Sequence, residues 1–183
     1  ILPIASKLNH EQAAAAFMLG ESVESTGGDP RRVGESVRVV GTNPFIVGDM
    51  AEEGNRFYEF IKAYPDKIQC YLLNTGGVGE IRETAPSGAR VVHRKALRVE
   101  IPEMASIIRG ILRNNINWVP EKLFGTLVPE KVEGVDMDKF APRGFYREDV
   151  IKDHARKLIR ERIEHLAQFV NLNPSIAKAA RPG

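Results

Sequence analysis

The feature that most constrains this 183-residue sequence is a helical pattern of apolar residues near its carboxyl end. Between residues 146 and 170, apolar side chains recur three or four positions apart, and charged residues fill the positions between them. This period is typical of an α-helix with one apolar face. We therefore predict one long amphipathic helix over 146–170, which must bury its apolar face against the rest of the fold. The apolar positions are Val150, Ile151, Ala155, Leu158, Ile159, Ile163, Leu166 and Phe169.

Three further helices are predicted from capping residues and spacing. Asn9 followed by Gln12 has the arrangement of a capping box, and the alanine-rich run after it predicts a helix over about 10–24. Aromatic and aliphatic residues at helical spacing predict a second helix over 51–64. Pro102 suits the first turn of a third helix. The apolar face of that helix consists of Met104, Ile107, Ile108 and Ile111.

Short apolar runs between these helices indicate strands. Lys67–Asn74 is rich in strand formers and leads into a glycine-rich loop, and Ala96–Ile101 is a second candidate strand. The polar stretch Glu80–Lys95 fits either an irregular excursion or a β-ribbon, and 119–142 is extended and interrupted by prolines. The length suits one compact unit, so we predict a mixed α/β fold.

Composition narrows the classes of partner. The 26 basic and 24 acidic residues are interspersed, whereas nucleic-acid-binding domains gather basic charge on one face. No stretch reaches the ~20 apolar residues that span a bilayer. We therefore expect a soluble, cytoplasmic protein that binds neither nucleic acid nor membrane. The single cysteine, Cys70, lies in an apolar run and is expected to be a buried core residue.

The chain contains no phosphate-binding loop of the Gly-x-x-x-x-Gly-Lys-Ser/Thr type. The loop Asn74–Gly79 follows a predicted strand, and its glycines would let backbone approach a ligand closely. A glycine-rich turn after a strand is equally compatible with a purely structural turn. Both interpretations stay open on the residues alone.

The remaining polar residues give no complete catalytic or metal site. The histidines are too far apart in sequence to share a metal, so we expect no metal site built from this chain and no catalytic residue in it. Arginines can bind an anion through two donors, although most are expected to be surface charges. The candidate anion-binding arginines are Arg31, Arg32, Arg38, Arg82 and Arg98.

Several motifs together resemble the ATP-using phosphoenolpyruvate carboxykinases, in the same order along the chain. The opening segment 2–13 is similar to the family's Leu-Pro-Pro-x-Ser-Lys/Arg-Leu-Thr-x-x-Gln, and 72–76 resembles its Leu-Val-Asn-Thr-Gly. Residues 124–135 match Phe-Gly-x-x-Val-Pro-x-x-x-x-Gly-Val without a gap. Further similarities are at Phe17-Met18-Leu19-Gly20, Ile107–Leu112 and Pro142-Arg143.

The resemblance implies the carboxyl-terminal, nucleotide-side lobe of that enzyme, with a domain over 1–170 and a tail over 171–183. It implies a nucleotide, ATP or GTP, beside Arg98 and Val99. It also adds the glycine-rich loop to the nucleotide site, through Asn74, Thr75, Gly76, Gly77 and Gly79.

The parent enzyme would decarboxylate oxaloacetate and transfer a phosphoryl group from ATP with a divalent metal. Its phosphate loop, metal ligands and substrate site are expected in a missing amino-terminal lobe of the same polypeptide. The fragment alone is then expected to be inactive.

Two alternatives remain at this point. Gly77 and Met104 stand where the family has tryptophan and threonine, which favours a non-catalytic nucleotide-sensing or interaction module. A flavodoxin-like or other α/β binding domain with coincidental matches would instead have a doubly wound parallel sheet.

Overall fold

The computed structural model describes residues 1–23, 36–41, 43, 45–84 and 90–181. The chain divides into two compact units, each made of separate stretches of sequence. Unit 1 comprises Ile1–Lys7 and Tyr71–Lys157, and unit 2 comprises Leu8–Cys70 and Leu158–Gly183.

A four-stranded sheet lies almost wholly within unit 1, in the order β4-β1-β8-β7. The strands are β1 (Ala5–Leu8), β4 (Cys70–Leu73), β7 (Trp118–Pro120) and β8 (Leu127–Pro129). Strand β8 runs antiparallel to both β1 and β7. The doubly wound parallel sheet is therefore wrong as an alternative, and the fold is mixed α/β.

The core of unit 1 forms where helix α3 (Ile101–Leu112) packs with the sheet and with the segment 132–145 that follows β8. Ile107 is fully buried, and Met104 and Ile111 are half-buried beside it, as the helical spacing predicted. The prediction is wrong for Ile108, which is 40% exposed because it lies at the edge of the apolar face. The short 3-10 helices η2 (Asp138–Phe140) and η3 (Pro142–Gly144) follow the sheet. Phe140 of η2 is buried in the same core.

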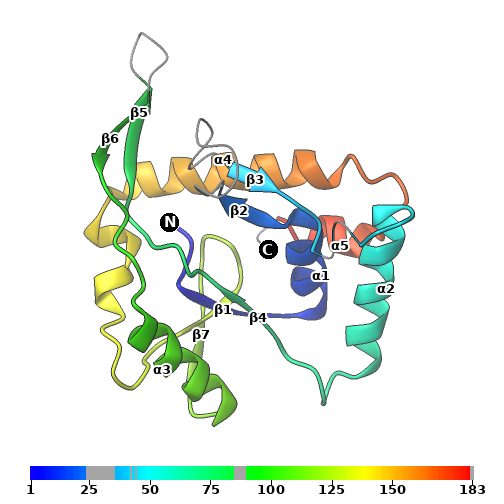
Figure 1. Ribbon diagram of the computed structural model, residues 1–183, viewed down its shortest axis with the longest axis horizontal. Helices are drawn as coiled ribbons and strands as arrows, with labels where there is room; N and C mark the ends of the chain where they lie inside the picture. The colour runs from blue at the N-terminus through cyan, green and yellow to red at the C-terminus, as the bar shows by residue number, and fades with distance from the viewer. Residues whose placement is uncertain (24–35, 42, 44, 85–89, 182–183) are drawn as a thin grey trace. The chain divides into compact units, whose positions relative to one another are not determined.

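The stretch Glu80–Lys95 contains a β-ribbon, which is one of the two structures predicted for it. Strands β5 (Ile81–Thr84) and β6 (Arg90–Arg94) pair antiparallel and project as a hairpin (Figure 1). The predicted strand over 96–101 is wrong. Leu97 makes only an isolated bridge to Val78, and α3 begins at Ile101 because a proline in its first turn favours helix there.

Unit 2 is built on α1 (His10–Leu19), α2 (Met50–Ala63) and α5 (Pro174–Lys178), with the strand pair β2 (Glu21–Val23) and β3 (Ser36–Arg38). Helices α2 and α5 both pack on α1 (Figure 1). The rings of Phe17 and Phe57 stack at 4.8 Å between α1 and α2. Gly54 allows α2 to approach α1 closely, because a Cβ at residue 54 would lie 2.3 Å from the sulfur of Met18 in α1.

The prediction of a helix over 10–24 is wrong at its carboxyl end. Helix α1 ends at Leu19, because Gly20 adopts the left-handed conformation (φ 47°) and its N–H bonds the Ala16 carbonyl at 3.0 Å. The predicted capping box at the other end is present, with Gln12 N–H donating to the Asn9 side chain at 2.8 Å. The second predicted helix, 51–64, is confirmed by α2.

The last long helix, α4, extends over Glu148–Leu166, within the predicted range 146–170. Residues 148–157 of α4 belong to unit 1 and 158–166 to unit 2. Leu166 and, in α5, Ile176 are fully buried in the core of unit 2. The described residues of the predicted tail 171–183 thus contribute to that core.

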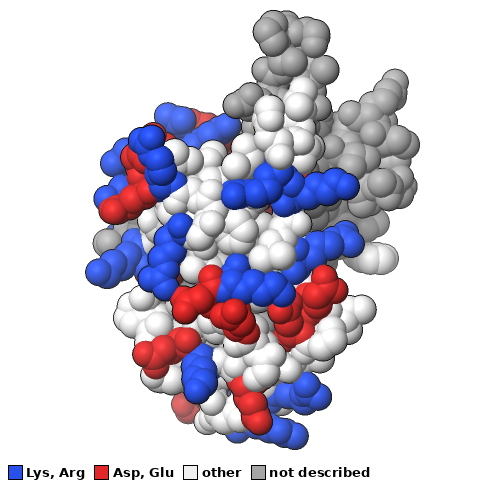
Figure 2. Space-filling view, turned by 90° about the vertical axis from the view of Figure 1, so that its left-hand side faces the viewer, with Lys and Arg blue, Asp and Glu red and all other residues white. Residues whose placement is uncertain are grey.

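Among the described residues, no helix is both long and apolar enough to cross a membrane. On the face shown in Figure 2, lysine and arginine side chains lie beside aspartate and glutamate side chains. Cys70 is half-buried, and burial raises the pKa of its thiol, which disfavours the reactive thiolate.

Candidate nucleotide site and a separate cavity

The loop after β4 is held in shape by one side chain, Asn74. Its Oδ1 accepts hydrogen bonds from the backbone N–H groups of Gly76 and Gly77, both at 3.1 Å. Its Nδ2 donates to the Gly77 carbonyl at 3.1 Å. The backbone N–H of Asn74 in turn donates to the Ile4 carbonyl at 3.0 Å, which ties the loop to the segment preceding β1.

Gly77 lies against the backbone of Leu97 and Arg98. Its φ of 136° favours glycine, and a Cβ at this position would lie 2.4 Å from the Leu97 carbonyl oxygen and 3.1 Å from the Arg98 Cα. Two hydrogen bonds between Val78 and Leu97, at 2.9 and 2.8 Å, hold the two segments together. Residues about twenty positions apart in sequence are thereby brought side by side.

The other end of the loop is closed by Arg94 and two aromatic rings. Arg94 donates from Nε to the Gly79 carbonyl and from Nη2 to the Phe145 carbonyl, both at 2.8 Å. Its guanidinium lies 5.1 Å from the centre of the Phe145 ring and 5.5 Å from that of Tyr146. A Cβ on Gly79 would lie 2.1 Å from the Phe145 ring, so this glycine packs under an aromatic side chain.

Tyr146 adds a second contact at this closed end. Its hydroxyl donates to the Glu80 carbonyl at 2.6 Å. Burial raises the pKa of Tyr146 even though Arg94 opposes the shift, so the phenol keeps its proton and remains a donor. The Phe145 ring thus covers Gly79 from this side, and a ligand would reach the loop from its open end, at Thr75 and Gly76.

The open end carries most of the nucleotide-site residues predicted from the sequence. Thr75 and Gly76 are exposed, and so is Arg98. The structure pairs Arg98 with no carboxylate among the residues it describes. Val99 is half-buried against the core of unit 1. The structure thus places the loop, Arg98 and Val99 in one region of unit 1.

The other predicted anion-binding arginines lie elsewhere. Arg38 is nearly buried in unit 2 and donates to Glu21 at 2.8 Å. Arg162 donates to the same carboxylate from Nε at 2.8 Å, so both guanidinium groups are held by one glutamate. Burial raises the pKa of Glu21, but the bonds and charges of Arg162 and Arg38 outweigh it and leave the pKa lowered. Arg31 and Arg32, and the side chain of Arg82, lie outside the described residues.

No three histidine, cysteine, aspartate or glutamate side chains come together as metal ligands in the described part of the chain. The rings of His154 and Tyr146 pack edge to face with their centres 5.6 Å apart, and those of His165 and Phe169 do so with their centres 5.4 Å apart. His165 has an unpaired, buried Nε2 among the described residues. Burial, followed by the charge of Arg38, lowers the pKa of His165, so its imidazole is held neutral.

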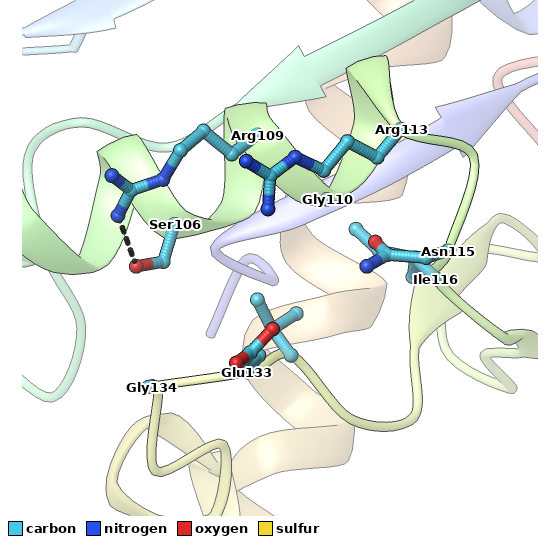
Figure 3. Close-up of a pocket in the computed structure, with 9 residues that line it drawn as sticks. Ser106, Arg109, Gly110, Arg113, Asn115, Ile116, Glu133 and Gly134 are labelled. Atoms are coloured by element: carbon cyan, nitrogen blue, oxygen red, sulfur yellow. Dashed lines mark hydrogen bonds between the residues drawn. The ribbon is translucent and has the colours of Figure 1, made fainter.

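Nothing in the sequence indicates the cavity that lies in unit 1 between α3 and residues 132–134 (Figure 3). Its volume is about 330 Å³. Ser106, Arg109, Gly110 and Arg113 line it from α3, at positions i, i+3, i+4 and i+7. This spacing is visible in the sequence, but nothing there indicates which segment faces it.

Comparison with known proteins gives a consistent family. The sequence model of a family described as phosphoenolpyruvate carboxykinase matches residues 1–138. A phosphoenolpyruvate carboxykinase (ATP) of Parvibaculum lavamentivorans is 28% identical over 98% of this chain and 32% of its own length. The enzyme of the same name from Rhodopseudomonas palustris strain HaA2 is 28% identical over 100% of the chain and 33% of its own length.

A protein of the same name from Aeropyrum pernix is 26% identical over 82% of the chain and 27% of its own length. The chain spans about a third of the length of the first two relatives. Because the family's sequence model matches 138 of the 183 residues, well over half, this chain belongs to the phosphoenolpyruvate carboxykinase family.

Proposed function

We propose that the chain forms the carboxyl-terminal, nucleotide-side lobe of a phosphoenolpyruvate carboxykinase-like enzyme, with its carboxykinase-like domain over 1–170 and a tail over 171–183. The family match supports this proposal, as do relatives that align over nearly all of the chain. The whole enzyme would decarboxylate oxaloacetate and transfer a phosphoryl group from ATP or GTP. An amino-terminal lobe of the same polypeptide would be its main partner, and the cytoplasm its location.

One observation carries the nucleotide site. Gly77 packs on the backbone at Leu97 and Arg98, so the loop and the arginine share one surface. A guanidinium with no carboxylate partner among the described residues can stack on a purine or donate to it. The proposed nucleotide-binding residues are Asn74, Thr75, Gly76, Gly77, Gly79, Arg98 and Val99.

The hydrogen bonds of the loop indicate which part of a nucleotide it would bind. Backbone N–H groups that bind phosphate must be free to donate. Here the N–H groups of Gly76 and Gly77 already donate to Asn74 Oδ1. The loop therefore suits the base or the ribose, and phosphate binding is assigned to the amino-terminal lobe.

A divalent metal would be held by that lobe as well. The described residues gather no set of three metal-ligating side chains, so we derive no step of the reaction through a metal on this chain. Phosphoryl transfer depends on positioning and on neutralising charge at the phosphates. We therefore expect the 183-residue chain alone to give no phosphoenolpyruvate from oxaloacetate and ATP, and a longer chain with the amino-terminal lobe to give it.

Calorimetric titration with ATP and GTP tests the site. Arg98→Ala should weaken nucleotide binding by about tenfold, since a charge-assisted contact contributes at least that factor. Lys95→Ala is the matched control, because Lys95 is an exposed cation three positions away and should leave binding unchanged. Equal affinity of the wild type and Arg98→Ala would remove Arg98 from the site.

A second candidate function is a nucleotide-sensing module without catalysis. Gly77 and Met104 favour it, because they replace the tryptophan and threonine of the family pattern. A sensor would bind ATP or GTP as a longer chain yet form no phosphoenolpyruvate with either nucleotide. An active longer chain would refute this alternative.

A further inference from the structure

The cavity beside α3 is separate in its lining from the proposed nucleotide site. None of its lining residues belongs to the loop 74–79 or to the segment 97–99. At about 330 Å³ it lies at the small end of the range for ligand pockets, which suits a small metabolite better than a nucleotide.

Gly110 gives the helical wall of this cavity its shape. Gly110 is buried, and a Cβ there would lie 2.8 Å from Ile116 Cδ1 and 3.3 Å from Asn115 Oδ1. Because glycine has no side chain, Ile116 can pack onto the helix at Gly110 and form the floor of the cavity. Ile116 belongs to the core of unit 1, so the floor of the cavity is part of that core.

The opposite wall is a tight turn over 132–135. Val132 is 4% exposed and packs in the core, and the N–H of Val135 donates to its carbonyl at 3.2 Å. Gly134 has φ 76°, which favours glycine at this turn. Glu133 is exposed, and the buried residue before it fixes its backbone at the cavity wall.

Three charged side chains, those of Arg109, Arg113 and Glu133, line the space between these walls. Arg109 Nη2 donates to Ser106 Oγ at 3.1 Å. The guanidinium of Arg113 and the carboxylate of Glu133 lie on opposite sides of the cavity and point into it (Figure 3). Among the described residues neither has an ion-pair partner, whereas Arg143 and Arg147 of the same unit are both paired.

We propose that this cavity binds a small acidic zwitterion, namely a dicarboxylic α-amino acid of the size of aspartate or glutamate. The two carboxylates would bind Arg109 and Arg113, because a guanidinium matches a carboxylate with two parallel donors. The ammonium group would bind Glu133. The site offers two positive charges and one negative, and such a ligand offers the reverse.

A structural role for the arginines makes a different prediction. Cations in the last turn of a helix stabilise the negative end of its dipole, and Arg109 and Arg113 lie at the end of α3. That role requires no ligand. It predicts lower stability on substitution and no heat on titration with any amino acid.

Calorimetry on the 183-residue chain separates these outcomes. L-aspartate and L-glutamate are titrated beside glutarate, which lacks the ammonium group, glutamine, which lacks one carboxylate, and inorganic phosphate. We expect one of the two acidic amino acids to bind more tightly than all three comparators. Absence of binding at millimolar concentration, or equal binding of glutarate or phosphate, would overturn the proposal.

Two variants test the assignment of the charged groups. Arg113→Gln should weaken binding of the amino acid by about tenfold or more. Glu133→Gln should weaken binding of the amino acid but not binding of glutarate, because only the amino acid carries an ammonium group. Arg143→Gln, a surface arginine of the same unit, is the control and should leave affinity unchanged. Unchanged affinity in Arg113→Gln would contradict the proposed site even if an amino acid binds.

Discussion

Arg94 offers the sharpest test of how the glycine-rich loop is held in place. Its guanidinium bonds two backbone carbonyls, of Gly79 and Phe145, and lies over two aromatic rings. Arg94→Met keeps most of the apolar stem but removes every donor and the charge. We expect unit 1 to lose stability and the loop to open more often.

The size of the effect follows from these contacts. A hydrogen bond from a charged donor contributes about 1.5–3 kcal/mol, and a cation–π contact about 0.5–1 kcal/mol. Arg94 is only partly buried, so water can replace some of these contacts in the variant. We expect the free energy of unfolding to fall by about 2–3 kcal/mol. The free energy of unfolding of Arg94→Lys should lie between those of the wild type and Arg94→Met, since one ammonium group cannot bond both carbonyls in the same fork geometry.

Trp118, the only tryptophan, lies in unit 1 and reports on that unit during urea unfolding. Hydrogen exchange at the Val78 and Leu97 amides, which bond each other's carbonyls, reports on the loop itself. Arg143→Met is the control, because its single ion pair is about 80% exposed. A loss below about 0.5 kcal/mol in Arg94→Met would refute the reasoning, since that is the range of ordinary surface substitutions.

Three further predictions concern unit 2, with hydrogen exchange of the α1 amides as the measurement. Gly20→Ala should cost more than about 2 kcal/mol, because it adds left-handed strain and a Cβ only 1.6 Å from the Val39 carbonyl oxygen; normal α1 protection would contradict this. Glu21→Gln should cost about 3–5 kcal/mol, because it removes the carboxylate charge that two nearly buried guanidinium groups bind; a cost under about 1 kcal/mol would show that solvent reaches them. The unfolded chain binds a proton on His165 near the usual pKa of about 6.5, whereas the folded chain resists it. The free energy of unfolding of unit 2 should therefore be independent of His165 protonation above about pH 6.5 and should fall as the pH drops toward the lowered pKa of His165 in the folded chain. His165→Gln should reduce this pH dependence.

Local signals in the sequence were sufficient where the structure follows local rules. The apolar spacing of 51–64 predicted α2, and the Asn9–Gln12 pair predicted the start of α1. The end of α1 was missed, because Gly20 is one glycine in a helix-favouring run and its left-handed conformation depends on the chain turning toward Val39. The apolar run after Lys95 predicts a strand, but among the described residues this run has one bridge partner, and the proline in the first turn of α3 ends it.

The sites depend on contacts that no local pattern encodes. The family resemblance implies the residues of the proposed nucleotide site, but the contact of Gly77 with Leu97 and Arg98 joins segments separated by β5 and β6. Similarly, the spacing from Ser106 to Arg113 defines one face of α3, whereas the facing turn at 132–135 comes from another part of the chain. Tertiary packing of unit 1 supplies both juxtapositions.

The most direct test of the nucleotide site is a titration of the ¹⁵N-labelled chain with ATP, followed by amide chemical shifts. We expect the largest changes at Thr75, Gly76 and Arg98; these changes should saturate together, and Arg98→Ala should weaken them. The same titration would contradict the account if the amides of the loop and of Arg98 stayed unchanged, or if the shifts were confined to the cavity beside α3.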